Sequence, residues 1–144
     1  MRIPGWCKQY TLAVNGKQVS PAVEKGYAVL DNEWKSGDVI TLDMAMPVEV
    51  VEADPRVKED IGKRAIQRGP LVYCMEETDN KKDFDKLAIS PATTFTEGFD
   101  ANLLNGVVTV KAADGDKCAS LIPYYAWDNR TAGKMKVWLD YKGE

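Results

Sequence analysis

Histidine is absent from the 144-residue sequence, and cysteine occurs only three times. Without an imidazole, these residues cannot supply a histidine base, a histidine-dependent triad or a histidine metal ligand. Cys7, Cys74 and Cys118 are widely spaced and form no C-x-x-C pair, so neither a zinc motif nor a disulfide framework is predicted, although one disulfide stays open. Cys74 lies in the apolar run 71–75, which predicts a buried and unreactive thiol. We predict no catalytic residue, no metal ligand and no cofactor within this sequence.

A basic surface and a long apolar segment are also lacking. The net charge of -3 offers no electrostatic footprint for nucleic acid or for an anionic membrane. No apolar run is long enough to span a bilayer, and residues 1–6 show no signal-peptide pattern. We therefore expect neither nucleic acid nor a membrane as a partner, and the cellular compartment stays open.

The 22 acidic residues are the remaining source of catalytic groups. A glycosidase needs two carboxyl groups about 5–10 Å apart, one of them with a raised pKa. The acidic residues here fall in loops, in one short predicted helix and on the polar faces of strands. We interpret them as solvated surface charges, among them Glu49, Glu52, Asp60, Asp79 and Asp83.

Short apolar runs of period two, separated by turn residues, fill the sequence. Residues 10–14 alternate in this way and end at Asn15-Gly16, which is typical of a type I′ hairpin turn. In residues 39–44, the alternating apolar side chains are expected to face a core. Residues 71–75 are apolar on both faces, which predicts a central buried strand. The alternating residues of 39–44 are Ile40, Leu42 and Met44.

The strand pattern is interrupted once by a predicted helix and once by a polar segment. Asp54 and Pro55 suit the first positions of a helix of about two turns over residues 55–61, with Val57 and Ile61 packing on one face. Residues 76–85 are predicted to form a solvated, mobile loop.

These elements together predict the fold class and the domain count. About ten short strands and one short helix near residues 55–61 indicate an all-β, jelly-roll-like sandwich. No internal repeat and no linker rich in proline, glycine or serine divides the chain, so residues 1–144 are predicted to form a single domain.

Aromatic side chains gather in one predicted loop near the end of the sequence. Tyr124, Tyr125 and Trp127 are followed there by the hydrogen-bonding side chains of Asn129 and Arg130. Such rings suit a docking surface, a core or a sugar-contact edge. The residues favour docking or core packing, and sugar contact is the alternative.

Several segments, taken in order, resemble one known family. They are similar to the C-terminal β-sandwich of glycoside hydrolases of the family 127 and 146 type, whose members include β-L-arabinofuranosidases. The resemblance covers nearly the whole chain, and residues 76–106 are its least distinctive part. The matching segments are residues 2–7, 14–17, 26–27, 34–38, 46–47, 67–74, 122–130 and 133–139.

The resemblance implies that catalysis lies elsewhere. In that family the chemistry belongs to an (α/α)6 barrel upstream of the sandwich, with a cysteine nucleophile and zinc bound by glutamate and cysteine. This sequence has no adjacent cysteines, so no such role is carried over to Cys7, Cys74 or Cys118. The implied parent is a retaining arabinofuranosidase-like glycosidase with zinc in its barrel, either periplasmic or secreted, and the cytoplasm stays open.

The resemblance also implies the partners of these residues. They would be a non-catalytic accessory domain, excised from a larger protein, that packs on the barrel and stabilises it. A second copy, in a homodimer, and plant-glycan saccharides are further expected partners. The alternative is an autonomous carbohydrate-binding module that uses the aromatic residues near 124–127. An excised domain is expected to expose an apolar patch where it packed.

Overall fold

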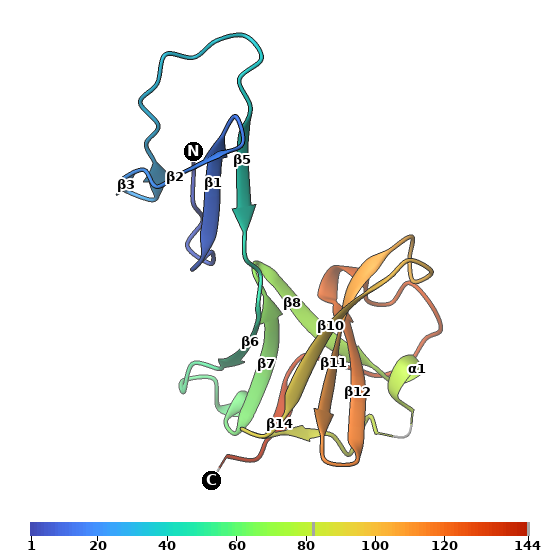
Figure 1. The fold of residues 1–144 in the computed structure, drawn as a ribbon. Helices are drawn as coiled ribbons and strands as arrows, with labels where there is room; N and C mark the ends of the chain where they lie inside the picture. The colour runs from blue at the N-terminus through green and yellow to red at the C-terminus, as the bar shows by residue number, and fades with distance from the viewer. Residues whose placement is uncertain (82, 144) are drawn as a thin grey trace. The chain divides into compact units, whose positions relative to one another are not determined.

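The computed structural model describes residues 1–81 and 83–143 and divides the chain into two compact units, residues 1–47 and 48–144 (Figure 1). The sequence predicted a single domain, whereas the chain forms two compact units. Strand β5 (Ile40–Met44) pairs within the first unit, and strand β6 (Val48–Glu52) pairs within the second. Only residues 45–47 separate these strands, so no stretch of linker composition marks the boundary.

Unit 1, residues 1–47, contains a small antiparallel sheet and a separate hairpin. The sheet has the order β2-β1-β5. Asn15 and Gly16 both have positive φ values, 50° and 76°, at the turn between β1 and β2, which confirms the predicted hairpin. The remaining strands are β1 (Tyr10–Val14), β2 (Lys17–Val19), β3 (Val23–Glu24) and β4 (Tyr27–Ala28), the last two forming the hairpin.

Unit 2, residues 48–144, is built on one nine-stranded sheet with the path β10-β11-β12-β8-β7-β14-β9. Strand β6 also pairs with β7, and β13 with β8; neighbours are antiparallel except β14 and β9. The all-β class is confirmed. The strands of this unit beyond β6 are β7 (Lys63–Arg68), β8 (Leu71–Glu76), β9 (Ala88–Ile89), β10 (Thr94–Asp100), β11 (Val107–Asp114), β12 (Lys117–Pro123), β13 (Met135–Lys136) and β14 (Leu139–Tyr141).

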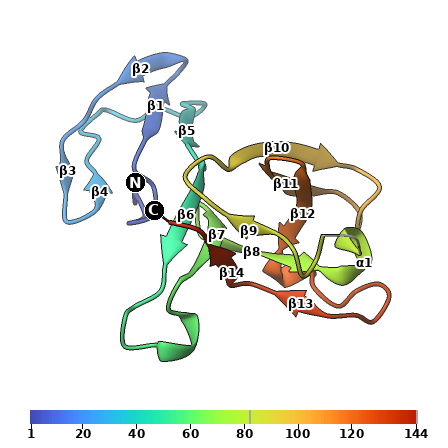
Figure 2. The ribbon, with the colours of Figure 1, turned by 90° about the horizontal axis from the view of Figure 1, so that it is seen from below.

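The sheet of unit 2 bends over a common core. Val110 on β11 and Leu121 on β12 belong to the same buried cluster as Ile89 on β9 and Leu139 on β14. Figure 2 shows strands β10, β11 and β12 on one side of this unit and β9 and β14 on the other. Strand β8 lies between β12 and β7, and its residues 73–75 are fully buried, which confirms the predicted central strand.

Three short helical segments occur in the described residues: the 3-10 helices η1 (Lys58–Asp60) and η2 (Tyr124–Ala126), and the α-helix α1 (Glu77–Asn80). The prediction of a helix of about two turns over 55–61 is wrong. Val57 and Ile61 are exposed, so no packed face stabilises it, and only η1 forms there. None of the described helices is long and apolar enough to cross a membrane.

The prediction of a solvated loop over 76–85 is also wrong for most of that segment. Helix α1 forms there, and Glu76, Asn80 and Phe84 are buried. Asn80 anchors the helix to β12, since its amide bonds both backbone polar groups of Ser120. Residue 82 of the predicted loop lies outside the described residues.

The core predicted for residues 39–44 does not form within unit 1. Leu42 is half-buried, but Ile40 and Met44 are exposed. The cause is the small number of apolar side chains that unit 1 buries. Its buried apolar residues are Cys7, Leu12 and Ala28.

Candidate functional site

The three aromatic side chains singled out in the sequence lie together on a tight turn. Strand β12 ends at Pro123, and η2 follows, closed by a hydrogen bond from the Trp127 N–H to the Tyr124 carbonyl oxygen (3.1 Å). The rings of Tyr124 and Trp127 stack, with centroids 6.1 Å apart and planes 20° apart. Tyr125, beside them, is 65% exposed. All three rings are exposed, so they are not core residues.

Asn129 is engaged mainly with the turn itself. Its side-chain amide donates to the carbonyl oxygens of Ala126 (3.1 Å) and Trp127 (3.0 Å). Both amide protons are therefore used to hold the aromatic turn, and the amide oxygen remains as an acceptor.

Arg130 points into the protein rather than toward a ligand. Its two terminal nitrogens donate to the two carboxylate oxygens of Asp79, at 2.7 and 2.6 Å, and Nη2 also contacts Glu76. Glu76 is only 5% exposed and accepts a further hydrogen bond from the Asp128 N–H (3.1 Å). The bonds to Asp79, followed by those to Glu76, raise the pKa of Arg130 against the opposing effect of burial. Arg130 is thus an anchor for the turn.

Sequence reasoning missed both partners of Arg130. Asp79 was interpreted as a solvated surface charge, and Glu76 was assigned to a solvated loop. They lie 51 and 54 residues from Arg130, so no local pattern connects them. The signal for Glu76 is its position at the end of β8, directly after three consecutive buried residues of that strand.

A hollow of about 330 Å³ lies beside the aromatic turn. One wall comes from the loop between β10 and β11, where Leu104, Asn105 and Gly106 all have positive φ. The Asp100 carboxylate holds this loop by accepting the N–H groups of residues 102 and 103, at 2.9 and 3.2 Å. The lining residues are Leu104, Asn105, Gly106, Val107, Tyr125, Ala126 and Asn129.

The three cysteines do not form a reactive group. All are free, and Cys74 is buried in a cluster with Ile122 and Ala126. Burial raises the pKa of the Cys74 thiol to about 12, so the thiol stays protonated near neutral pH. Cys7 is buried and donates to the Gln9 carbonyl oxygen (3.2 Å), whereas Cys118 is exposed. The predicted buried, unreactive state of Cys74 agrees with this environment.

The family resemblance implies zinc in the upstream barrel, and the requirements of such a metal site can be compared with the described residues. Within residues 1–81 and 83–143, no group of three or more histidine, cysteine, aspartate or glutamate side chains could hold a metal ion. In the described part of the chain, the carboxyl groups with a shifted pKa are shifted downward by hydrogen bonds, which is opposite to the requirement for a general acid. They are Asp38, Asp54, Asp85 and Asp114.

Comparison with known families divides the chain where the structure does. The family model described as "Glycoside hydrolase family 127 C-terminal domain" matches residues 48–140. The model described as "Beta-L-arabinofuranosidase, GH127 middle domain" matches residues 1–46. The sequence resemblance, which assigned the whole chain to the C-terminal sandwich, is refined accordingly.

Individual relatives carry the same family assignment. The chain is 37% identical to a non-reducing end beta-L-arabinofuranosidase of Bifidobacterium longum subsp. longum, an alignment that covers 95% of this chain and 25% of the relative. The crystal structure of Ara127N, a GH127 beta-L-arabinofuranosidase from Geobacillus stearothermophilus T6, matches with a TM-score of 0.87 and 36% identity over 98% of this chain and 26% of that one. A second GH127 beta-arabinofuranosidase structure matches with a TM-score of 0.85 and 33% identity, over 98% and 27%. The chain thus spans about a quarter of the length of these relatives.

Proposed function

Because the chain belongs to glycoside hydrolase family 127, we propose that its two units are a non-catalytic accessory region of a larger β-L-arabinofuranosidase-like protein. In this proposal the region packs on a catalytic barrel of that protein and stabilises it. The observation that carries the proposal is the apolar face of the unit 1 sheet, on which Ile40 and Met44 remain exposed.

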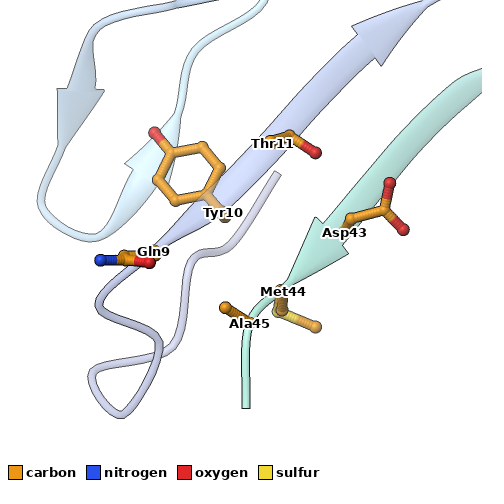
Figure 3. A pocket seen from close by; sticks show the side chains of 6 residues that line it. All are labelled: Gln9, Tyr10, Thr11, Asp43, Met44 and Ala45. Carbon is orange, nitrogen blue, oxygen red and sulfur yellow. The ribbon is translucent and has the colours of Figure 1, made fainter. Parts of the chain in front are cut away.

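One face of the unit 1 sheet is apolar and only partly covered, because Leu12 is buried whereas Ile40 and Met44 are exposed. Strands β1 and β5 pair so that Val14 lies opposite Ile40, Leu12 opposite Leu42, and Tyr10 opposite Met44, all on the same face. At one end of this pair lies a hollow of about 460 Å³, lined by residues 9–11 and 43–45. Figure 3 shows the side chains of these residues around it.

Burial of apolar surface is the reason that this face would gain from a partner. Unit 1 buries the apolar residues Cys7, Leu12 and Ala28 and leaves Ile40 and Met44 exposed. Further apolar contacts to these exposed side chains would remove them from water and stabilise the unit. We propose that these apolar contacts come from other segments of the larger protein, namely the remainder of the middle domain and the barrel.

The chemistry of the larger protein is proposed to lie outside these residues. The protonated Cys74, the anchoring role of Arg130 and the absence of a metal-binding group among the described residues all favour this assignment. We place the zinc in the barrel, and we assign no step of the reaction to residues of this chain. The substrate class proposed for the larger protein is that of its relatives, a β-L-arabinofuranoside.

The decisive experiment is hydrogen exchange of the β1 and β5 amides in the 144-residue chain and in the larger protein. We expect fast exchange in the chain alone and strong protection in the larger protein. Ile40→Lys should lower the Tm of the larger protein by several degrees, and Thr41→Lys, on the opposite face of β5, should have little effect.

Two outcomes would contradict the proposal. The first is equal sensitivity of the larger protein to the two lysine substitutions. The second is hydrolysis of an aryl β-L-arabinofuranoside by the 144-residue chain itself. A second copy covering the face would instead appear as a concentration-dependent dimer that Ile40→Lys dissociates.

A further inference from the structure

The hollow beside Tyr125 is built from groups that suit a neutral, polyhydroxylated ligand. Its lining combines an exposed aromatic ring, apolar side chains and two asparagine amides, and it contains no charged side chain. We propose that this hollow is a saccharide-binding site, with Tyr125 stacking on a sugar ring and the two amides bonding its hydroxyl groups. The proposal goes beyond the packing function. Only the choice of arabinose sugars as the first ligands rests on the proposed function, through the substrate class proposed for the larger protein.

The two amides offer complementary hydrogen bonds. Asn129 donates both of its protons to the turn, so its oxygen is available to accept from a hydroxyl. Asn105 is exposed, and its side chain makes no hydrogen bond within the described part of the chain. It can therefore donate and accept. Hydroxyl groups both donate and accept, so a sugar satisfies this pair, whereas an anion or a cation would meet no opposite charge.

The floor of the hollow is apolar and buried. Val107 and Ala126 lie there, both almost fully buried, with the partly buried Leu104 beside them. Its volume of about 330 Å³ lies at the lower end of the range for small-molecule sites, and suits about one or two sugar rings rather than a long chain.

Both sides of the hollow are held by hydrogen bonds within the protein. Asp100 holds the loop of Asn105 through two backbone N–H groups, and a hydrogen bond from the Gly106 N–H to the Leu103 carbonyl oxygen (2.8 Å) closes the turn. On the other side, Arg130 and Glu76 fix residues 126–129. A preformed site loses little conformational entropy on binding, which favours measurable affinity for a small ligand.

The test is a titration of the 144-residue chain with L-arabinose and arabino-oligosaccharides, in which two-dimensional NMR spectra are recorded at each ligand concentration. We expect saturable shifts confined to residues around 104–107 and 124–129, with a Kd in the millimolar range or tighter. Tyr125→Ala should weaken binding about tenfold or more, and Tyr125→Phe should preserve it. Tyr27→Ala removes another exposed tyrosine, from unit 1, and should leave the Kd unchanged.

Asn105→Gly tests the polar half of the site without backbone strain, because glycine accepts the φ of 65° at this position. It should also weaken binding. Saturable binding with a Kd that neither Tyr125→Ala nor Asn105→Gly changes would overturn the proposal. Absence of shifts with any arabinose, xylose or glucose oligosaccharide would overturn it too and would make the rings a protein-docking surface. The hydrogen-exchange experiment on β1 and β5 is unaffected by either result.

Discussion

Arg130 and Asp79 form a bidentate ion pair that joins the aromatic turn to helix α1 across 51 residues of sequence. The side chain of Arg130 is 23% exposed, and Glu76, its second partner, is nearly inaccessible. One guanidinium therefore pairs with two carboxylates at the edge of the core. The position of the candidate sugar site depends on this pairing, because residues 126–129 precede Arg130 directly.

Arg130→Met should destabilise unit 2 by about 2–4 kcal/mol, because it leaves the buried Glu76 without a counter-charge. The free energy of unfolding in urea, followed by tryptophan fluorescence, measures this loss. Arg56→Met removes the exposed pair with Asp54 and should change it by less than about 0.5 kcal/mol. Equal losses for the two variants would contradict the structural role of Arg130.

Asn80→Ala should cost about 2–4 kcal/mol of stability, because it leaves three backbone groups unpaired. The Asn80 amide bonds the Glu76 carbonyl (2.7 Å) and the Ser120 carbonyl (2.9 Å), and its oxygen accepts the Ser120 N–H (2.7 Å). The same denaturation assay applies. The exposed Asn102→Ala is the control and should be near neutral.

Cys74 should resist thiol reagents in the folded protein. Its ionisation should also lower the free energy of unfolding at high pH. Its pKa of about 12 lies above the ordinary value of 9.0, so the folded protein retains a proton that the unfolded chain releases. The stability that Cys74 contributes is complete below pH 9.0 and declines as the pH rises toward about 12.

Two measurements check this behaviour. Below pH 9, a maleimide should label Cys118 rapidly and reach Cys74 only after unfolding. Between pH 9 and 12, the unfolding free energy should fall more steeply for the native sequence than for Cys74→Ala. Parallel curves for the two proteins would contradict the raised pKa.

Gly106→Ala should destabilise unit 2 by about 1–3 kcal/mol, because φ at this position is 105°. A Cβ there would also lie 2.7 Å from Cζ of Phe99. Phe99 is 70% exposed and can move, so a Phe99→Ala background should remove only the steric part of the loss. Gly115→Ala, with φ at 60° and no atom within 4 Å of the new Cβ, isolates the backbone part.

The sequence predicted those features that depend on neighbouring residues. The Asn15-Gly16 turn and the buried strand at 71–75 are of this kind, because turn geometry and apolar periodicity act over a few positions. The rings of Tyr124, Tyr125 and Trp127 lie on one turn with Asn129, and the docking or sugar-contact role predicted for them stays a prediction. The outward orientation of this turn was one of the alternatives that the residues left open.

The failures share a different physical cause, which is the identity of distant partners. The helix predicted at 55–61 has suitable residues at its start, but the structure gives Val57 and Ile61 nothing to pack against. The face of β5 has the periodicity of a core strand and lacks the core. Arg130 could be recognised as a donor, but not as the partner of two carboxylates more than fifty residues earlier.

Strand β14 sets the order in which unit 2 can be assembled during synthesis. It lies between β7 and β9, and beyond it the Lys142 N–H bonds the Ile89 carbonyl (2.8 Å). The strands on both sides of it emerge from the ribosome some fifty residues or more before it does. The sheet of the nascent unit therefore stays open between β7 and β9 until β14 has been synthesised. Chaperone dependence and aggregation during translation should concentrate in that interval.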